Sequence, residues 1–195
     1  MNFLAHLYLS GEDPGVITGN FMGDSVKGRD LQHLQPSVAL GVRLHRAIDH
    51  FTDTHPLTGT ARERLRTHSG RYAGVALDMI YDHLLASSWP EWHAEPLPRY
   101  AQRMYHLLQQ HSHLMPPRTR QMLPYVVAGD WLGSYAREEG LARALDGLSR
   151  RAREADRLKG AEQVLRTHRL AFEDEFRVFL PALIQHIQPM LHAPA

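Results

Sequence analysis

Apolar residues recur along this chain at three- and four-residue steps, the spacing that gives a helix one apolar face. The run with the clearest spacing lies near the C-terminus and consists of Phe172, Phe176, Phe179, Leu180, Leu183, Ile187 and Leu191. It predicts a long helix in which Pro181 introduces a kink or a local break. A second run, from Val38 to Phe51, predicts a helix that starts after Pro36 and ends before Pro56.

Four further segments show helical spacing, and the prolines cluster between the apolar runs. These segments cover residues 75–85, 97–114, 119–132 and 141–158. No segment shows a convincing alternate-residue pattern of a strand, and no repeat or flexible linker divides the 195 residues. We therefore expect a single all-α domain over residues 1–195, with about seven to nine helices.

The composition is that of an ordinary globular chain, with 43% hydrophobic and 22% charged residues, and it excludes a disordered or collagen-like protein. No apolar window is long enough to span a membrane, and the first residues lack the features of a signal peptide. We therefore expect a cytoplasmic protein without a membrane partner. The net charge of +1 gives no general attraction to nucleic acid, so we expect no nucleic-acid partner.

The chain has no cysteine and 14 histidines, and this narrows the candidate chemistry. The lack of cysteine excludes disulfides, thiolate zinc sites, iron–sulfur clusters and a cysteine nucleophile. Any metal must therefore be bound through imidazole and carboxylate groups. That donor set favours Mn²⁺, Mg²⁺, Fe²⁺ or Zn²⁺ over soft metals.

The second predicted helix carries His45, Asp49 and Asp53 at four-residue intervals. Side chains at that spacing lie on one stripe, about 5–6 Å apart, which suits two groups that bind one divalent ion. The alternative for His45 and Asp49 is a solvated helix face paired with Arg43 and Arg46. For Asp53 the alternative is a helix-terminating turn.

The helix predicted over residues 75–85 repeats this arrangement with Asp78 and Asp82, and His83 follows directly. The apolar neighbours of the two aspartates predict buried carboxylates, which need either a paired charge or a metal. A cation between them would also relieve their mutual repulsion. A metal site and a buried network of salt bridges to arginines are therefore the two alternatives.

The amino-terminal segment adds two candidates. His6 lies among apolar residues, where it is either a hydrogen-bonded core residue or a ligand. Asp24 follows an apolar pair and precedes Lys27, which favours a functional role for this carboxylate. Together with the helix residues, these side chains favour hydrolysis of a phosphoester, because a divalent ion lowers the pKa of bound water and neutralises phosphoryl oxygens.

Four motifs, in order along nearly the whole chain, resemble the acyl carrier protein phosphodiesterase family. They are Asn2-Phe3-Leu4-Ala5-His6-Leu7, Gly19-Asn20 with Asp24, His45-Arg46-x-Ile48-Asp49 with Thr52-Asp53, and Leu77-Asp78-x-x-Tyr81-Asp82-His83. That family is regarded as a divergent, all-helical branch of the HD metal-dependent phosphohydrolases. The resemblance implies an HD-domain-like fold, Mn²⁺ as the cofactor and holo-acyl carrier protein as the substrate, from which 4′-phosphopantetheine is released. HD enzymes carry the pair His-Asp, whereas this chain has it reversed as Asp82-His83.

The resulting site hypothesis places one or two divalent cations on five ligands, which are Asp24, His45, Asp49, Asp78 and Asp82. Asp24 is also assigned to catalysis, and His83 orients the water, protonates the serine oxygen or ligates the metal. Lys27 and Arg46 are the candidate substrate-binding residues. Arg46 is turned about 100° from the ligand stripe, so an outward salt bridge is the alternative for its guanidinium.

Two other functions remain open on the sequence, namely an HD-type hydrolase of nucleotides or cyclic nucleotides and a non-catalytic helical interaction module. Acyl carrier proteins are strongly acidic, so we also expect a cationic segment to contact the substrate protein. Positive charge is concentrated in residues 62–66 and in residues 150–153 with Arg157 and Lys159. A solvated helix face is the alternative for both segments.

Overall fold

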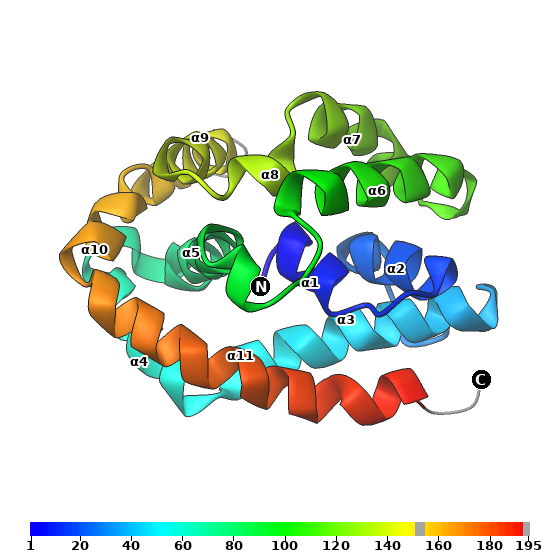
Figure 1. The fold of residues 1–195 in the computed structure, drawn as a ribbon, viewed down its shortest axis with the longest axis horizontal. Helices are drawn as coiled ribbons and strands as arrows, with labels where there is room; N and C mark the ends of the chain where they lie inside the picture. Colours follow the sequence, from blue (N-terminus) through cyan, green and yellow to red (C-terminus); the bar gives the residue numbers. More distant parts are fainter. Residues whose placement is uncertain (151–154, 193–195) are drawn as a thin grey trace.

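The computed structural model describes residues 1–150 and 155–192, and within these ranges every regular element is a helix (Figure 1). The α-helices are α1 (Phe3–Tyr8), α2 (Pro14–Phe21), α3 (Pro36–Thr54), α4 (Pro56–Ser69), α5 (Ala73–Ser87), α6 (Leu97–Gln110), α7 (Pro117–Ala128), α8 (Trp131–Ser134), α9 (Glu138–Ser149), α10 (Ala161–Thr167) and α11 (Arg169–His192). The 3₁₀ helices are η1 (Gly23–Ser25), η2 (Gly70–Tyr72), η3 (Trp89–Glu91), η4 (Ser112–Leu114) and η5 (Ala155–Leu158). The predicted all-α class is confirmed.

Prolines determine where several of these helices begin. The first residues of α2, α3, α4 and α7 are Pro14, Pro36, Pro56 and Pro117. Proline suits a first turn, because its φ angle is already helical and its missing N–H is not needed there. The predicted end of α3 before Pro56 is confirmed, since the helix ends at Thr54, and its start is one residue earlier than predicted, at Pro36 itself.

The C-terminal helix differs from its prediction. α11 is 24 residues long and continues through Pro181 and Pro189, so a local break at Pro181 is wrong, whereas the alternative of a kink stays a prediction. Phe179, Leu180 and Leu183 are fully buried, and the packing of this face compensates for the hydrogen bond that Pro181 cannot donate. Neither α11 nor any other described helix is long and apolar enough to cross a membrane.

The described residues form more helices than the predicted number of about seven to nine, because very short helices carry no periodic signal. α1, α8 and α10 contain six, four and seven residues. The segment predicted as one helix over residues 141–158 is divided, since α9 ends at Ser149 and η5 covers Ala155–Leu158. The residues between 151 and 154 lie outside the described part of the chain.

The short helix α1 lies in the interior of the fold. Figure 1 shows it between α5 and α2, with α3 and α11 running side by side on the other edge of the molecule. Leu4, Ala5 and Leu7 are fully or almost fully buried. The burial of α1 brings the side chain of His6 next to the middle of α3.

The helix pair α2 and α3 packs more extensively than any other, and glycines allow its close approach. A Cβ at Gly19 would overlap the backbone oxygen of Val38, and a Cβ at Gly41 would overlap that of Val16. Neither position accepts a larger residue without separating the two helices. The crossing places the C-terminal end of α2 directly against the helix that carries His45 and Asp49.

Candidate metal centre

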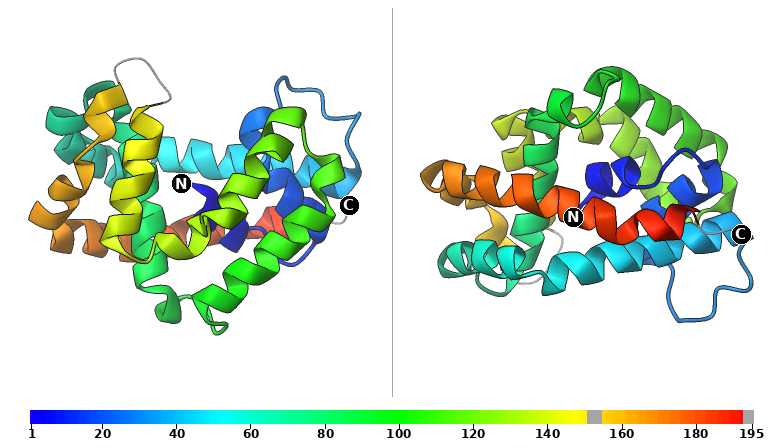
Figure 2. Two further views of the ribbon diagram at one scale, coloured as in Figure 1. Left: turned by 90° about the horizontal axis from the view of Figure 1, so that it is seen from above. Right: turned by 60° about the horizontal axis from the view of Figure 1, so that its bottom comes forward.

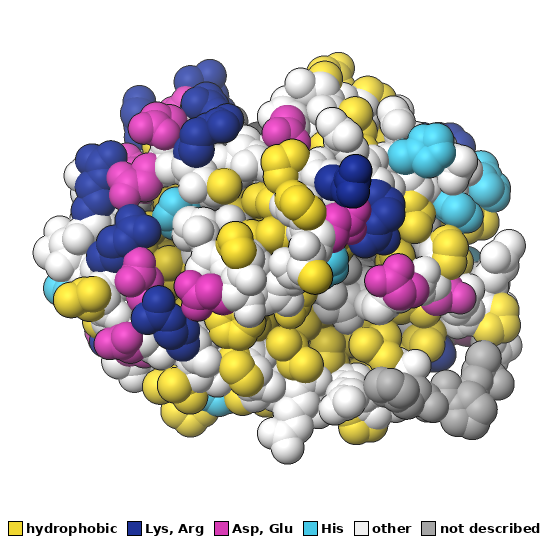
Figure 3. Space-filling model, in the orientation of Figure 1, with side chains coloured by type: hydrophobic (Ala, Val, Ile, Leu, Met, Phe, Trp, Pro, Cys, Tyr) yellow, Lys and Arg dark blue, Asp and Glu magenta, His cyan; other side chains and the backbone are white. Residues whose placement is uncertain are grey.

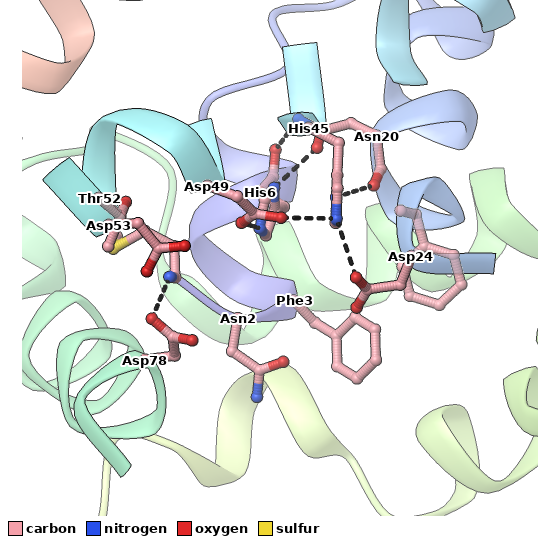
Figure 4. A pocket seen from close by; sticks show the side chains of 12 residues that line it. Asn2, Phe3, His6, Asn20, Asp24, His45, Asp49, Thr52, Asp53 and Asp78 are labelled. Carbon is pink, nitrogen blue, oxygen red and sulfur yellow. Dashed lines mark hydrogen bonds and ion pairs between the residues drawn. The ribbon is translucent and has the colours of Figure 1, made fainter. Parts of the chain in front are cut away.

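Three side chains from two helices meet in a cavity of about 180 Å³ (Figure 4). His6 lies on α1, and His45 and Asp49 lie one turn apart on α3. The Oδ1 atom of Asp49 is 3.2 Å from His6 Nε2, and its Oδ2 atom is 3.1 Å from His45 Nε2. One ligand atom from each residue lies within 4.8 Å of the other two. The predicted pair His45 and Asp49 is therefore brought together, and His6 completes a three-residue cluster.

Asp24 contributes a second carboxylate to this cluster from η1. Its Oδ1 atom is 3.3 Å from His45 Nε2, and its side chain is 87% exposed, so it faces the solvent side of the site. Gly23 makes this contact possible, because a Cβ at that position would overlap the imidazole ring of His45. Asp24 is thus the accessible member of the cluster.

Asn20 fixes the orientation of both imidazole rings. Its side-chain amide donates to the backbone oxygen of His6 and to Ser10 Oγ, so its Oδ1 atom is the acceptor that lies 2.8 Å from His6 Nδ1. Its backbone oxygen lies 2.9 Å from His45 Nδ1. In the neutral rings both Nδ1 atoms therefore carry the proton, which leaves each Nε2 atom facing Asp49, where it can bind a cation or carry a second proton.

Sequence reasoning assigned no role to Asn20, although it forms part of the motif Gly19-Asn20. The sequence feature that could have indicated a role for Asn20 is its position, four residues before Asp24 and directly after Gly19, which lies at the crossing of α2 and α3. A polar side chain there has to be buried, and a buried amide requires hydrogen-bond partners. Which partners it finds depends on the packing of α1, which the sequence pattern does not specify.

The protonation states within the cluster follow from burial and from these contacts. Burial lowers the pKa of His6. Burial also opposes the charged form of His45, but hydrogen bonds to Asp24 and Asp49 outweigh it and raise the pKa of His45 to about 9. Burial would raise the pKa of Asp49, yet its hydrogen bonds to the two histidines lower that pKa. The cluster thus holds a proton on His45 at neutral pH, at the position where a divalent cation would otherwise balance the carboxylates.

The donor set fits a divalent metal ion. The rings of His6 and His45 are stacked, with centroids 4.1 Å apart and planes 19° from parallel, so their Nε2 atoms project into the same space. Metal-binding histidines commonly donate the other ring N–H to a backbone oxygen or an amide, as both of these rings do. Two imidazoles with one or two carboxylates match the preference of borderline divalent ions.

Two further predicted residues, Asp53 and Asp78, line the same cavity but already have partners. Asp53 Oδ1 is 3.1 Å from Arg62 Nη1 on α4. Asp78 Oδ1 accepts a hydrogen bond of 2.6 Å from the amino group of Met1. Burial raises the pKa of Asp78, and the amino group of Met1 acts in the opposite direction. Figure 4 shows both carboxylates on the side of the cavity away from Asp24.

Asp82 and His83 are not brought into the cluster, and neither lines the cavity. Asp82 is fully buried and accepts hydrogen bonds from the backbone N–H groups of Asn2, Leu4 and Ala5, at 3.0, 2.7 and 3.3 Å. It therefore holds the first turn of α1 against α5. His83 Nδ1 lies 2.7 Å from the backbone oxygen of Tyr135, at the start of the segment that leads to α9.

The two predicted substrate-binding cations lie in different surroundings. The guanidinium of Arg46 donates to the backbone oxygens of Val26 and Gly28, so it holds the loop that follows η1. The ammonium of Lys27 donates to the backbone oxygen of Asp24 and lies on the surface. Arg46 therefore holds the loop after η1, while the ammonium of Lys27 contacts the backbone of Asp24.

Carboxylates neutralise most of the cations that the sequence suggested for docking. In the segment 62–66, Arg62, Arg64 and Arg66 form ion pairs with Asp53, Glu175 and Glu63. In the second segment, Arg150 and Lys159 both lie near Asp146, and residues 151–153 lie outside the described part of the chain. Figure 3 shows the same mixture, with Lys and Arg side chains interleaved with Asp and Glu on the side of α4, α9 and α10.

Comparison with known proteins gives a consistent result over the whole chain. A family model described as acyl carrier protein phosphodiesterase matches residues 1–183. The chain is 34% identical to the acyl carrier protein phosphodiesterase of Enterobacter sp. (strain 638), over 94% of this chain and 96% of that relative. It is 31% identical to the protein of that name from Photorhabdus laumondii, over 95% and 94% of the two chains, and 30% identical to that from Yersinia pestis, over 96% and 98%. No solved structure matches the chain. This chain belongs to the acyl carrier protein phosphodiesterase family.

Proposed function

We propose that the protein hydrolyses the phosphodiester that joins 4′-phosphopantetheine to a serine of holo-acyl carrier protein, which yields apo-acyl carrier protein and free 4′-phosphopantetheine. Family membership supports the substrate. The observation that carries the chemistry is the cluster of His6, His45 and Asp49, whose ligand atoms converge within 4.8 Å in an open cavity. Two imidazoles and a carboxylate that converge in an open cavity favour a catalytic metal site over an interaction module without catalysis.

His6, His45 and Asp49 would hold one divalent cation, and Asp24 would complete its ligands from the solvent side. We favour Mn²⁺, with Mg²⁺, Fe²⁺ and Zn²⁺ as the alternatives that the same donors accept. Such an ion supplies a water of lowered pKa and neutralises charge on the phosphoryl oxygens. A second cation at Asp78 would have to replace the amino group of Met1, which now occupies one carboxylate oxygen.

The residues of the chain prepare the site for this chemistry. Asn20 holds both imidazoles in the tautomer that presents Nε2, which removes the need to reorganise the rings when a ligand binds. The hydrogen bond from His45 lowers the pKa of Asp24, so this exposed side chain is an ionised carboxylate at neutral pH and is available to a cation. We therefore assign Asp24 to metal binding, and no role in the reaction to His83, which lies outside the cavity.

A substrate panel tests this proposal against the nucleotide alternative. The protein, loaded with Mn²⁺, is given holo-acyl carrier protein, a set of nucleoside phosphates and cyclic nucleotides, and bis(p-nitrophenyl) phosphate as a general diester. We expect kcat/KM to be highest for holo-acyl carrier protein. A higher kcat/KM for a nucleotide would support the other branch of HD hydrolases and would contradict the proposed substrate.

A further inference from the structure

A second and larger cavity opens beside the candidate metal centre. Its volume is about 790 Å³, within the roughly 300–1,000 Å³ that is usual for sites that bind small molecules. The two cavities have six lining residues in common, namely Met1, Asn2, Phe3, Phe21, Asp24 and Asp78. We call the larger cavity the cleft. Because the two cavities share these lining residues, they are continuous, and a molecule bound in the cleft can reach Asp24.

The cleft lies between helices that are far apart in the sequence. Figure 2 (left) shows the N-terminal residues with α9 on one side and α6 and α7 on the other. Among the residues that line the cleft, Met122 comes from α7, Trp131 from α8, and Gly147 and Leu148 from α9. The cleft thus extends from the metal centre outwards between α7 and α9.

The lining of the cleft combines apolar and polar groups. Next to the metal centre, the ring of Phe3 packs against Phe21 and Trp131, with centroids 5.2 and 6.0 Å apart. Polar side chains such as Asn2 and Ser134 lie among these apolar walls. Such a lining suits a flexible molecule that alternates apolar groups with amides and hydroxyls.

Three cations from three separate elements stand along the cleft. Lys27 follows η1, Arg118 belongs to the first turn of α7, and Arg143 lies on α9, and all three are exposed. Within the described part of the chain, Arg118 and Arg143 form no ion pair, in contrast to the arginines of α4. Their charges are therefore available to an anionic partner.

We propose that the cleft binds the pantetheine arm of holo-acyl carrier protein while Lys27, Arg118 and Arg143 face the acidic surface of the carrier. The inference rests on the proposed function, because that function fixes what must enter. A phosphodiester at Asp24 has two substituents, and the serine belongs to a folded protein that a cavity of about 790 Å³ cannot admit. The pantetheine arm carries a dimethyl group, a hydroxyl and two amides on a flexible chain, which matches the lining of the cleft.

Gly147 offers a way to close the cleft without disturbing the fold. A Cβ at this helical position meets nothing within 4 Å, so an added side chain extends into the cleft space. Gly59 on α4 is a matched control, because it is also helical and open, and it lines neither cavity. The variants are Gly147→Ala, Gly147→Trp and Gly59→Trp, with thermal unfolding of each protein as the measure of folding.

We expect Gly147→Trp to lower kcat/KM for holo-acyl carrier protein at least about tenfold, because the loss of one set of packing contacts costs about 1.4 kcal/mol or more. Gly147→Ala should lose less than the tryptophan variant, and Gly59→Trp should stay close to the wild type. Equal kcat/KM for Gly147→Trp and Gly59→Trp would overturn the assignment of the cleft. The alanine variant keeps the test valid should the tryptophan variant fail to fold, since a graded loss would already be visible.

Direct binding of 4′-phosphopantetheine, followed by titration calorimetry, separates this inference from the proposed function. If the wild type binds the compound and Gly147→Trp binds it at least about tenfold more weakly, the cleft is supported even when holo-acyl carrier protein is not cleaved. In that outcome only the proposed function fails. If holo-acyl carrier protein is cleaved but Gly147→Trp binds the compound as tightly as the wild type, the function stands and the cleft assignment is wrong. Failure of the wild type to bind the compound also overturns the cleft.

Discussion

We expect Asp82→Ala to destabilise the fold by about 3–5 kcal/mol, because this carboxylate holds the start of α1 and is not part of the metal centre. The substitution leaves the backbone N–H groups of Asn2, Leu4 and Ala5 without their acceptor, in a region where the Asp82 side chain was fully buried. At about 1–3 kcal/mol for each buried and unpaired N–H group, the loss would be about 3–9 kcal/mol.

Two features of the site reduce that figure. The bond from the Ala5 N–H is long, at 3.3 Å, and contributes least. Burial raises the pKa of Asp82 to about 7. The cost of burying the ionised carboxylate therefore offsets part of the stabilisation that its hydrogen bonds provide. The expected loss is therefore about 3–5 kcal/mol, at the lower end of that range, which does not exceed the total stability of about 5–15 kcal/mol that is usual for a folded domain.

The assay is urea denaturation of the wild type, Asp82→Ala and the control Asp13→Ala. Asp13 also accepts two backbone hydrogen bonds, as the N-cap of α2, but its side chain lies on the surface, so its loss should cost only about 0.5–2 kcal/mol. A metal titration is run on each protein in parallel. If Asp82→Ala unfolds within about 1 kcal/mol of the wild type and loses bound metal, Asp82 is a metal ligand, as its spacing from Asp78 suggested, and does not serve to hold α1.

Three further outcomes are expected. Asn20→Ala should weaken Mn²⁺ binding about 10–100-fold, because the ring of His6 loses the side-chain acceptor that fixes its tautomer, while the backbone oxygen that faces His45 Nδ1 is kept. Unchanged affinity in a calorimetric titration would contradict this. Activity should disappear with EDTA and return with Mn²⁺ better than with Ca²⁺, since imidazole donors suit a transition ion; equal recovery with both ions in a rate assay would count against the site. Because the pKa of His45 is raised from 6.5 to about 9, protonated His45 should stabilise the metal-free protein. This stabilisation is fully present below about pH 6.5 and is lost as the pH rises through about 9. The denaturation midpoints of the wild type and His45→Gln should therefore differ most at low pH, and a difference that does not change with pH would exclude the effect.

The sequence predicted the fold class and the position of the longer helices, because those helices bury one continuous apolar face. The limits of α3 were clear, since prolines stand at Pro36 and Pro56. The continuity of α11 through Pro181 could not be predicted from the sequence, because it depends on the packing of Phe179 and Leu183 against the rest of the core. Very short helices such as α1 carry too few turns for a periodic signal.

The candidate site was only partly predictable for a related reason. Helical spacing placed His45 and Asp49 together, because a separation of four residues is a local property of one helix. The same spacing also suggested Asp78 with Asp82, but the burial of α1 gives each carboxylate a partner at the chain's amino-terminal segment instead. Contacts between elements distant in the sequence decide which of two pairs with the same spacing joins the cluster of His6, His45 and Asp49.

The intact mass of holo-acyl carrier protein after incubation with this protein shows directly whether the His6–His45–Asp49 cluster supports metal-dependent hydrolysis. We predict that with Mn²⁺ the wild type removes the mass of phosphopantetheine, that EDTA prevents the loss, and that His45→Gln and Asp49→Asn leave the carrier unchanged although both variants stay folded. The two substituted residues are the members of the cluster that lie on α3. Loss of phosphopantetheine in the presence of EDTA, or at an undiminished rate with both variants, would contradict the assignment of the metal centre.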